Sequence, residues 1–356
     1  MRCVGELTEY DITLAAQPGE TLEQMVGQLA EQLHSADAEM LRLVAFVPAD
    51  CRDRLNGALH DAFGEVDWPV TQLCGVGAVP ESQTLGLQAH AVAGATIDRL
   101  AFEDRPIGSL YSDGHAQYVL LGNLFDPNLS LSRHDQCRGT FELMEQVLEP
   151  LGMDFDNVVR TWLFADRILE WYGDLNKARS SFFTDRGVFG RRVPASTGVG
   201  IGNPWGAAMV ADVLAMAPAA DNPCIAEPVG SPLQCPALDY GSAFSRAMEL
   251  RVPGSRRLLI SGTASIEPGG ETVHNTIEEQ IDWTMQVVEA LLRSRGMDHS
   301  DVCRAILYYA NPDWFGKLEE WQAARDIEPY PATNAQADIC RDDLLFEIEL
   351  DAEAAD

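Results

Sequence analysis

Two glutamates near the end of the chain have a spacing that suits acid–base chemistry. Glu347 and Glu349 lie two residues apart in the run LLFEIELDA, over which the pattern predicts a strand at 344–352. Side chains at this spacing point to one face of a strand, and the apolar residues between them point to the other. Adjacent carboxylates repel each other, so burial would raise the pKa of one of them. Because such a carboxyl can act as a general acid, we predict a catalytic role for the pair, the alternative being a solvated strand face.

Three further polar residues are candidates for the same site. We predict that Cys340, seven residues before Glu347, is catalytic as a nucleophile or a polar gatekeeper; the alternative is an inert buried thiol. A guanidinium suits bidentate binding of a carboxylate, so Arg246 and Arg341 are predicted to hold an anionic substrate. The alternative for these two arginines is that each forms an ion pair with an acidic residue on the surface.

Hydroxyl, imidazole and aromatic side chains complete the predicted binding surface. Alternating hydroxyls along a predicted strand could point into one cleft, or could bond to neighbouring backbone. A lone histidine after a Gly-Gly turn could titrate near neutral pH, or could be structural or solvated. Two aromatic residues would form apolar walls. The residues predicted to contact a substrate are Arg246, Arg341, Tyr240, Phe244, Thr263, Ser265 and His274.

The elements that must position these residues occur as an internal repeat. Residues 145–166 and 289–310 both read as the end of an amphipathic helix, a Gly-Met-Asp turn and a β-rich run. Gly152 and Gly296 suit the left-handed conformation at a helix end. A weaker copy lies at 22–50.

An arginine recurs at one point of each copy. Arg42, Arg160 and Arg304 each lie near the start of the predicted strand. Recurrence in all three copies favours a shared structural task at the seams between repeats, with substrate binding as the alternative.

The elements that follow extend the repeat. Second helices are predicted at 51–63, 169–183 and 314–324, each followed by a proline turn, and final strands at 85–94, 207–216 and 344–352. Hairpins are predicted at 115–125 and 244–266, whereas the first copy offers only a strand at 10–15, and 217–237 has the composition of a linker. We therefore predict an α/β (α+β) fold of three ββαβαβ repeats, the first degenerate, with domains at 1–98, 99–222 and 223–356.

Composition limits the partners. The chain has 356 residues, with 55 acidic against 25 basic residues and a formal charge of −30, which disfavours nucleic acid and leaves a small anionic metabolite as the expected partner. Eight cysteines without a CxxC pair and isolated histidines predict no metal, and no cofactor is expected. The first residues do not read as a signal peptide, and no apolar run approaches the ~20 residues of a membrane span, so we expect no membrane association and a cytoplasmic protein.

Several segments together resemble a known superfamily. FSRAMEL (244–250), LLISGTASI (258–266), VCRAILYY (302–309) and FEIELDA (346–352) resemble the RidA/YjgF/UK114 superfamily. Its members are usually trimers of one short, chorismate mutase-like domain with ligand sites between subunits. For three copies in one chain, the resemblance implies a pseudo-trimer with its site in a cleft between repeats.

One feature of the superfamily's deaminases is missing. They bind the carboxylate of an imine with an arginine directly after a Pro-Ala turn. The matching positions here are Thr71, Ser196 and Thr333, none of which is an arginine. Imine or enamine deamination is therefore a weaker alternative, and so is ribonuclease activity.

A closer similarity is to the chorismatases, which use this fold in one long chain. It lies in Phe244-Ser245-Arg246-Ala247, in 261–266, in 340–349, and in the run VVRTW with the tyrosine and Asn-x-x-Arg that follow it. The resemblance implies hydrolytic release of pyruvate from chorismate or a related enol-ether acid, with Glu347 matching the catalytic glutamate. Chorismatases carry Gly-Pro-Arg-Ser-Pro before Phe-Ser-Arg-Ala, where this chain reads DYGS at 239–242, which implies a sister group with another substrate.

The main alternative is a binding protein of the same fold that holds a small metabolite without chemistry. A closed polar pocket around Glu347 would favour the enzyme, and an open cleft the binding protein. The chain is expected to be a monomeric pseudo-trimer or a homodimer joined through the sheet edge of the first repeat.

Overall fold

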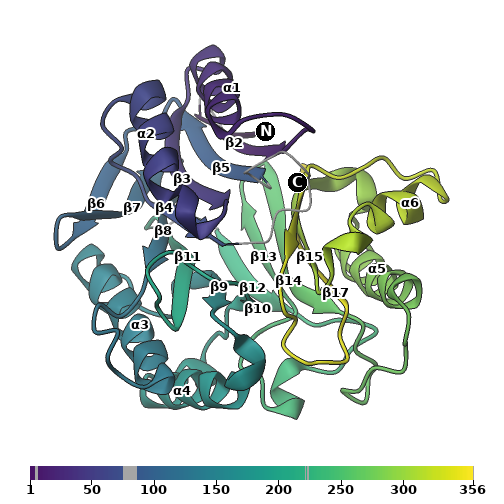
Figure 1. The fold of residues 1–356 in the computed structure, drawn as a ribbon. Helices are drawn as coiled ribbons and strands as arrows, with labels where there is room; N and C mark the ends of the chain where they lie inside the picture. The colour runs from purple at the N-terminus through teal and green to yellow at the C-terminus, as the bar shows by residue number, and fades with distance from the viewer. Residues whose placement is uncertain (5–6, 75–85, 221, 223, 356) are drawn as a thin grey trace.

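The computed structural model describes residues 1–4, 7–74, 86–220, 222 and 224–355. Three similar units succeed one another along the chain, and each has a mixed sheet with two helices on one face. In Figure 1 the helices lie at the periphery and the strands face the interior, with the two chain ends close together. The predicted α+β pseudo-trimer is confirmed.

The first repeat has a five-stranded sheet in the order β1-β2-β5-β3-β4. Its elements are β1 (Arg2–Val4), β2 (Leu7–Ala15), α1 (Leu22–Ser35), β3 (Glu39–Phe46), α2 (Arg52–Phe63), β4 (Val70–Leu73) and β5 (Gly86–Ala93). It does contain a hairpin, β1–β2, contrary to the prediction of an isolated strand, but β1 has only three residues.

The second repeat has a six-stranded sheet in the order β10-β9-β11-β8-β7-β6. Its elements are β6 (Asp98–Phe102), β7 (Arg105–Ser112), β8 (Ala116–Leu124), α3 (Arg133–Leu148), β9 (Val158–Ala165), α4 (Tyr172–Asp185), β10 (Ala195–Gly200) and β11 (Met209–Pro218).

The third repeat has the same strand order, β12-β13-β14-β17-β15-β16. Its elements are β12 (Ile225–Val229), β13 (Ala247–Val252), β14 (Ser255–Ala264), α5 (Ile277–Ser294), β15 (Val302–Tyr309), α6 (Lys317–Ala323), β16 (Ala332–Gln336) and β17 (Phe346–Ala355).

The first helix of every repeat begins at a hydroxyl side chain. Thr21, Ser132 and Thr276 accept hydrogen bonds from the backbone of the first helical turn, and the two threonines complete capping boxes. Such caps satisfy backbone N–H groups that have no partner within the helix. Gly152 and Gly296 have φ of 72° and 68°, which confirms their predicted left-handed conformation.

Each sheet buries both faces. One face packs on the helices of its own repeat, forming three separate apolar clusters. The other faces meet in a shared central core, to which all three repeats contribute aromatic side chains: Phe46, Tyr118, Trp162, Phe164 and Tyr308. Two-sided burial explains why the strands read as nearly continuous apolar runs.

The segment predicted as a linker, 217–237, contains strand β12, which pairs with β13. The composition of the segment favoured a linker, but Pro228 is tolerated on β12 because one side of an edge strand needs no ladder hydrogen bond. Residues 221 and 223 of this segment, and residue 85 of the predicted strand at 85–94, lie outside the described residues.

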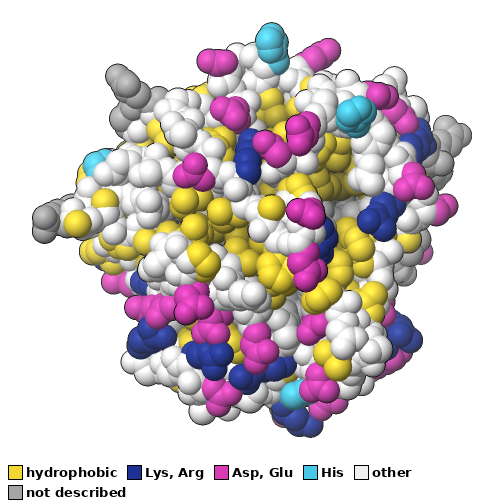
Figure 2. Space-filling view, turned by 90° about the vertical axis from the view of Figure 1, so that its left-hand side faces the viewer, with side chains coloured by type: hydrophobic (Ala, Val, Ile, Leu, Met, Phe, Trp, Pro, Cys, Tyr) yellow, Lys and Arg dark blue, Asp and Glu magenta, His cyan; other side chains and the backbone are white. Residues whose placement is uncertain are grey.

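Acidic side chains are spread over the surface. Figure 2 shows one side of the molecule, on which Asp and Glu are scattered and apolar atoms gather across the middle. The described part of the chain contains no helix that is both long and apolar enough to cross a bilayer.

Candidate active site

Where two repeats meet, an arginine of one contacts the sheet of the next. We call the contacts between repeats one and two, two and three, and three and one the first, second and third seams. Arg42 pairs with Asp212, Arg160 with Glu349, and Arg304 donates to Gln88 at 3.0 Å. The three guanidinium carbons lie 4.3, 5.2 and 5.6 Å from the centre of the Trp162 ring. The predicted structural role of these arginines at the seams is confirmed.

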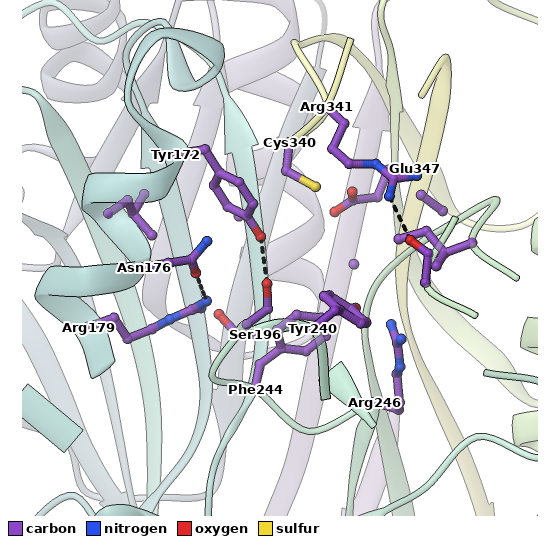
Figure 3. Close-up of a pocket in the computed structure, with 17 residues that line it drawn as sticks. Tyr172, Asn176, Arg179, Ser196, Tyr240, Phe244, Arg246, Cys340, Arg341 and Glu347 are labelled. Atoms are coloured by element: carbon purple, nitrogen blue, oxygen red, sulfur yellow. Dashed lines mark hydrogen bonds between the residues drawn. The ribbon is translucent and has the colours of Figure 1, made fainter. Parts of the chain in front are cut away.

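The second seam encloses a cavity of about 320 Å³, within the size range of small-molecule sites. Helix α4 and strand β10 of the second repeat form one side, and β14, β17 and three loops of the third repeat form the other (Figure 3). The lining residues are Tyr172, Leu175, Asn176, Arg179, Ser196, Gly198, Tyr240, Ser242, Phe244, Arg246, Gly262, Ala264, Ile266, Gly270, Cys340, Arg341 and Glu347.

Glu347 is the carboxylate of this cavity, and its side chain is largely buried, with 5% of the residue exposed. Burial, reinforced by the neighbouring charge of Glu349, raises the pKa of Glu347 to about 8. Its carboxyl lies directly over Gly262, where a Cβ would collide with Oε1. None of the described residues hydrogen-bonds to this carboxyl. Burial and the charge of Glu349 thus favour the protonated form of the Glu347 carboxyl, which faces the cavity.

Glu349 lies on the same strand face but does not line the cavity. Its Oε2 accepts hydrogen bonds from Arg160, from Trp162 Nε1 at 2.5 Å and from Thr197 Oγ1 at 2.9 Å. Its Oε1 accepts from Arg304 Nη1 at 3.0 Å. Burial alone would raise the pKa of Glu349, but Arg304 and Arg160 outweigh it and lower the pKa. Glu349, for which a catalytic role was predicted together with Glu347, is thus outside the cavity, and its oxygens are engaged by protein donors.

The cavity contains three arginines. Arg246 is held by the carbonyl of Cys235, at 3.1 Å from Nε and 2.9 Å from Nη2, and Arg341 Nη1 donates to the carbonyl of Gly270 at 2.7 Å. Arg341 Nε also lies 3.1 Å from Asp343. Both predicted substrate-binding arginines thus line one cavity.

Arg179, on α4, is the arginine of the Asn-x-x-Arg run that resembles the chorismatases, but it was not predicted as a site residue. Its Nη2 donates to Asn176 Oδ1 at 2.6 Å, and its buried Nε has no hydrogen-bond partner. Burial lowers the pKa of Arg179, and among the described residues no carboxylate pairs with it. A buried guanidinium without an acid partner is suited to an anionic ligand.

Three other predicted residues line the cavity. Tyr240 and Phe244 form aromatic walls, and the guanidinium of Arg246 lies 5.4 and 5.5 Å from their ring centres. Burial, with the nearby Glu347, raises the pKa of Cys340 to about 12. Cys340 is therefore a neutral thiol at neutral pH and forms part of the cavity wall. Nucleophilic attack would require the thiolate, which this pKa disfavours.

The remaining predicted residues lie outside the cavity. The β14–β17 pairing shifts register between Ile260 and Thr263, so Gly262 and Ala264 face the cavity. Thr263 Oγ1 instead donates to the carbonyl of Ser261 at 2.8 Å. Ser265 Oγ bonds to His274 Nδ1 at 2.8 Å, and the His274 ring stacks on Trp283. Thr263, Ser265 and His274, which were predicted to contact a substrate, are thus not among the residues that line the cavity. For the two residues at the end of β14, the reason is a β-bulge that shifts the alternation of side chains.

The residues missed by the sequence prediction come mostly from α4. Tyr172, Asn176 and Arg179 lie at i, i+4 and i+7, which places them on one helix face together with Leu175. A polar stripe among apolar residues at this spacing was the available signal. In each repeat, the strand that carries the seam arginine pairs with a parallel edge strand: β4, β10 or β16. Two residues beyond the residue opposite the arginine, these edge strands carry Thr71, Thr197 and Thr333. The structural equivalent of Thr71 and Thr333 is therefore Thr197 and not Ser196.

Comparison with known proteins shows what the chain is similar to in sequence and in fold. No protein-family model matches the chain. A chorismatase from Streptomyces rapamycinicus is 27% identical over 239 residues, which are 59% of this chain and 69% of that protein. A crystal structure of a chorismatase matches 97% of this chain and 98% of its own, with 18% identity and a TM-score of 0.66. A member of the YjgF/YER057c/UK114 family from Mycobacterium tuberculosis covers 36% of the chain at 22% identity, with a TM-score of 0.29. The chain is thus similar in sequence to a chorismatase and has the chorismatase fold.

Proposed function

We propose that the second-seam cavity hydrolyses the enol ether of chorismate or a closely related acid and releases pyruvate, with Glu347 as the general acid. The observation that carries the proposal is the charge arrangement of the cavity. A single protonated carboxyl faces a space whose other ionisable walls include Arg179, Arg246 and Arg341. The similarity to proteins named chorismatase supports the same assignment.

The proposed reaction needs one proton donor and one water. Glu347 donates its proton to the terminal methylene carbon of the enol ether, and positive charge develops on the carbon that bears the ether oxygen. Water adds to that carbon and returns a proton to Glu347. The resulting hemiketal collapses to pyruvate and the ring alcohol, so the sum is substrate plus water giving pyruvate plus alcohol.

The arginines suit the substrate side of this reaction. A carboxylate binds a guanidinium through charge-assisted hydrogen bonds, which are stronger when water is excluded. Arg179 lies on the α4 side of the cavity and Arg246 on the opposite side (Figure 3). This placement suits a small molecule with anionic groups at separate positions, although the whole chain carries a formal charge of −30.

The alternative of a binding protein without chemistry is less well supported. A binding site requires arginines but has no need of a buried carboxyl that retains its proton at neutral pH. Imine deamination has less support, because threonines occupy the position of the required arginine in all three repeats: Thr71, Thr197 and Thr333.

The test is incubation of the purified protein with chorismate, following pyruvate in a coupled assay and the ring product by absorbance. Glu347→Gln is expected to lower kcat by about 10²- to 10⁴-fold, the usual contribution of a general acid. Glu353→Gln is the matched control, since Glu353 is on the same strand but outside the cavity and bonds to Ser255. Absence of pyruvate release by the wild type, or equal release by Glu347→Gln, would contradict the proposal.

A further inference from the structure

Glu349 forms a fixed negative charge beside the proposed acid. It lies two residues from Glu347 on β17, so the two side chains leave the same strand face about 6.6 Å apart. Four side-chain donors from β9, β10 and β15 hold its two oxygens. A carboxylate with this many donors, and with no exposure to solvent, has one position and one charge state.

Besides Glu349, the charged groups that face Glu347 are Arg160 and the cavity arginines Arg179, Arg246 and Arg341. Arg160 on β9 and Arg246 before β13 favour its ionised form, but their effects are smaller than that of Glu349. Tyr308 on β15, directly opposite Glu347 in the register, and Cys340 are both neutral near pH 7, because burial raises the pKa of each. Arg304 on β15 donates to Oε1 of Glu349.

We propose that Glu349 is a positioning residue for Glu347: its immobile carboxylate opposes ionisation of the acid and keeps it loaded with a proton at neutral pH. This inference rests on the proposed function, since it concerns the acid of that reaction. Glu349 touches no substrate in this scheme. The same Glu349 carboxylate thus pairs with the seam arginine Arg160 and affects the protonation of Glu347 in the cavity.

The first variant to make is Glu349→Gln, which keeps the size of the side chain and removes its charge. The pH at which activity falls on the alkaline side should move down by about one to two units. That is the Coulomb effect of two charges about 6.6 Å apart at an effective dielectric constant of about 20. Glu349→Asp retains the charge and should return the midpoint toward the wild-type value.

A second readout does not depend on catalysis. The infrared carbonyl band of the protonated Glu347 carboxyl, assigned by its absence in Glu347→Gln, can be titrated in each variant. The midpoint should lie near 8 in the wild type and shift down in Glu349→Gln. A shifted band in a protein that releases no pyruvate would reject the proposed function while supporting the electrostatic role.

Glu349→Gln leaves the buried Arg160 without its acid and Arg304 with Asp351 alone, so this variant could fail to fold. The fallback is Glu349→Gln with Arg304→Gln, which removes one buried charge of each sign. Asp351 then still pairs with Arg257 at 3.0 Å. The infrared midpoint should again move down. An unchanged midpoint in a folded Gln variant, or an equal shift in Glu349→Asp, would overturn the inference.

Discussion

The first and second seams have the same ion-pair architecture but different outcomes. In the first, Arg42 pairs with Asp212, whose Oδ1 accepts from Thr71 Oγ1 at 2.7 Å. In the second, Arg160 pairs with Glu349, whose Oε2 accepts from Thr197 Oγ1 at 2.9 Å. Strand register places these groups at equivalent points of the repeat.

The seams differ two residues further along the last strand. Val210 in the first seam occupies the position of Glu347 in the second. Val210 is fully buried in a small apolar cluster with Phe125 and Ala207, against which Trp205 packs. The equivalent space of the second seam is the arginine-lined cavity.

Different residues of a seam account for the joining of repeats and for the candidate chemistry. A buried arginine–carboxylate pair at a seam joins repeats and does not by itself make a site, since the first seam has such a pair and an apolar filling. The candidate chemistry of the second seam comes from one additional carboxyl and from the cavity that this carboxyl faces.

The largest expected effect is on the first seam. Asp212→Ala leaves Arg42 buried without its carboxylate, so the free energy of unfolding should fall by about 3–5 kcal/mol. Pyruvate release by the folded fraction should keep its wild-type kcat. Urea unfolding and steady-state kinetics of the same preparation measure both. A loss of kcat in fully folded protein would mean that the first seam takes part in the chemistry.

Stability should depend on pH through Glu347, a group found only in the second of these two seams. The folded state retains a proton up to about pH 8 that the unfolded chain releases near 4.5. The stabilisation is complete below pH 4.5 and is lost as the pH rises to about 8. Relative to Glu347→Gln, the free energy of unfolding should fall by about 1.4 kcal/mol per pH unit across this window, a few kcal/mol in all. A difference that stays flat from pH 5 to 8 would show that Glu347 ionises normally.

Local sequence patterns were sufficient for the repeats. Helix periodicity, the glycines at 152 and 296, and apolar strand runs depend on near neighbours, so the sequence predicts the three units before their packing is known. Strand alternation also correctly placed both glutamates on the face opposite to Phe346 and Ile348, which pack toward the helices of the third repeat.

Long-range contacts were not predictable in the same way. Whether Glu347 or Glu349 faces the cavity depends on Arg160, which precedes Glu349 by 189 residues and belongs to another repeat. Arg179 enters the cavity only because the second repeat packs against the third. The β14 bulge depends on its pairing with β17, which a single strand pattern does not reveal.

Arg179 should be required for binding and not for stability. Arg179→Met would fill part of the second seam with an apolar side chain, as Val210 and its neighbours fill the first. Loss of one charge-assisted contact should raise KM by about 10- to 100-fold. Because no carboxylate among the described residues pairs with this buried guanidinium, Tm should stay the same or rise. The control is Arg54→Met, which removes an arginine from an exposed pair with Glu23 in the first repeat. An unchanged KM in Arg179→Met would show that Arg179 does not bind the substrate.

The smallest expected effect is that of Thr263→Val, which tests whether side chains beyond the β14 bulge in the second seam face away from the cavity. Thr263 is buried one residue after Gly262, yet its hydroxyl donates to the carbonyl of Ser261 and not into the cavity. Thr263→Val keeps the shape and removes that bond, so the free energy of unfolding should fall by about 1 kcal/mol. The value of kcat/KM should remain within about threefold, because a bond that only fixes the bulge changes the population of folded protein more than its chemistry. A larger fall in kcat/KM with unchanged stability would mean that this hydroxyl reaches the substrate, and that the second seam uses both faces of β14.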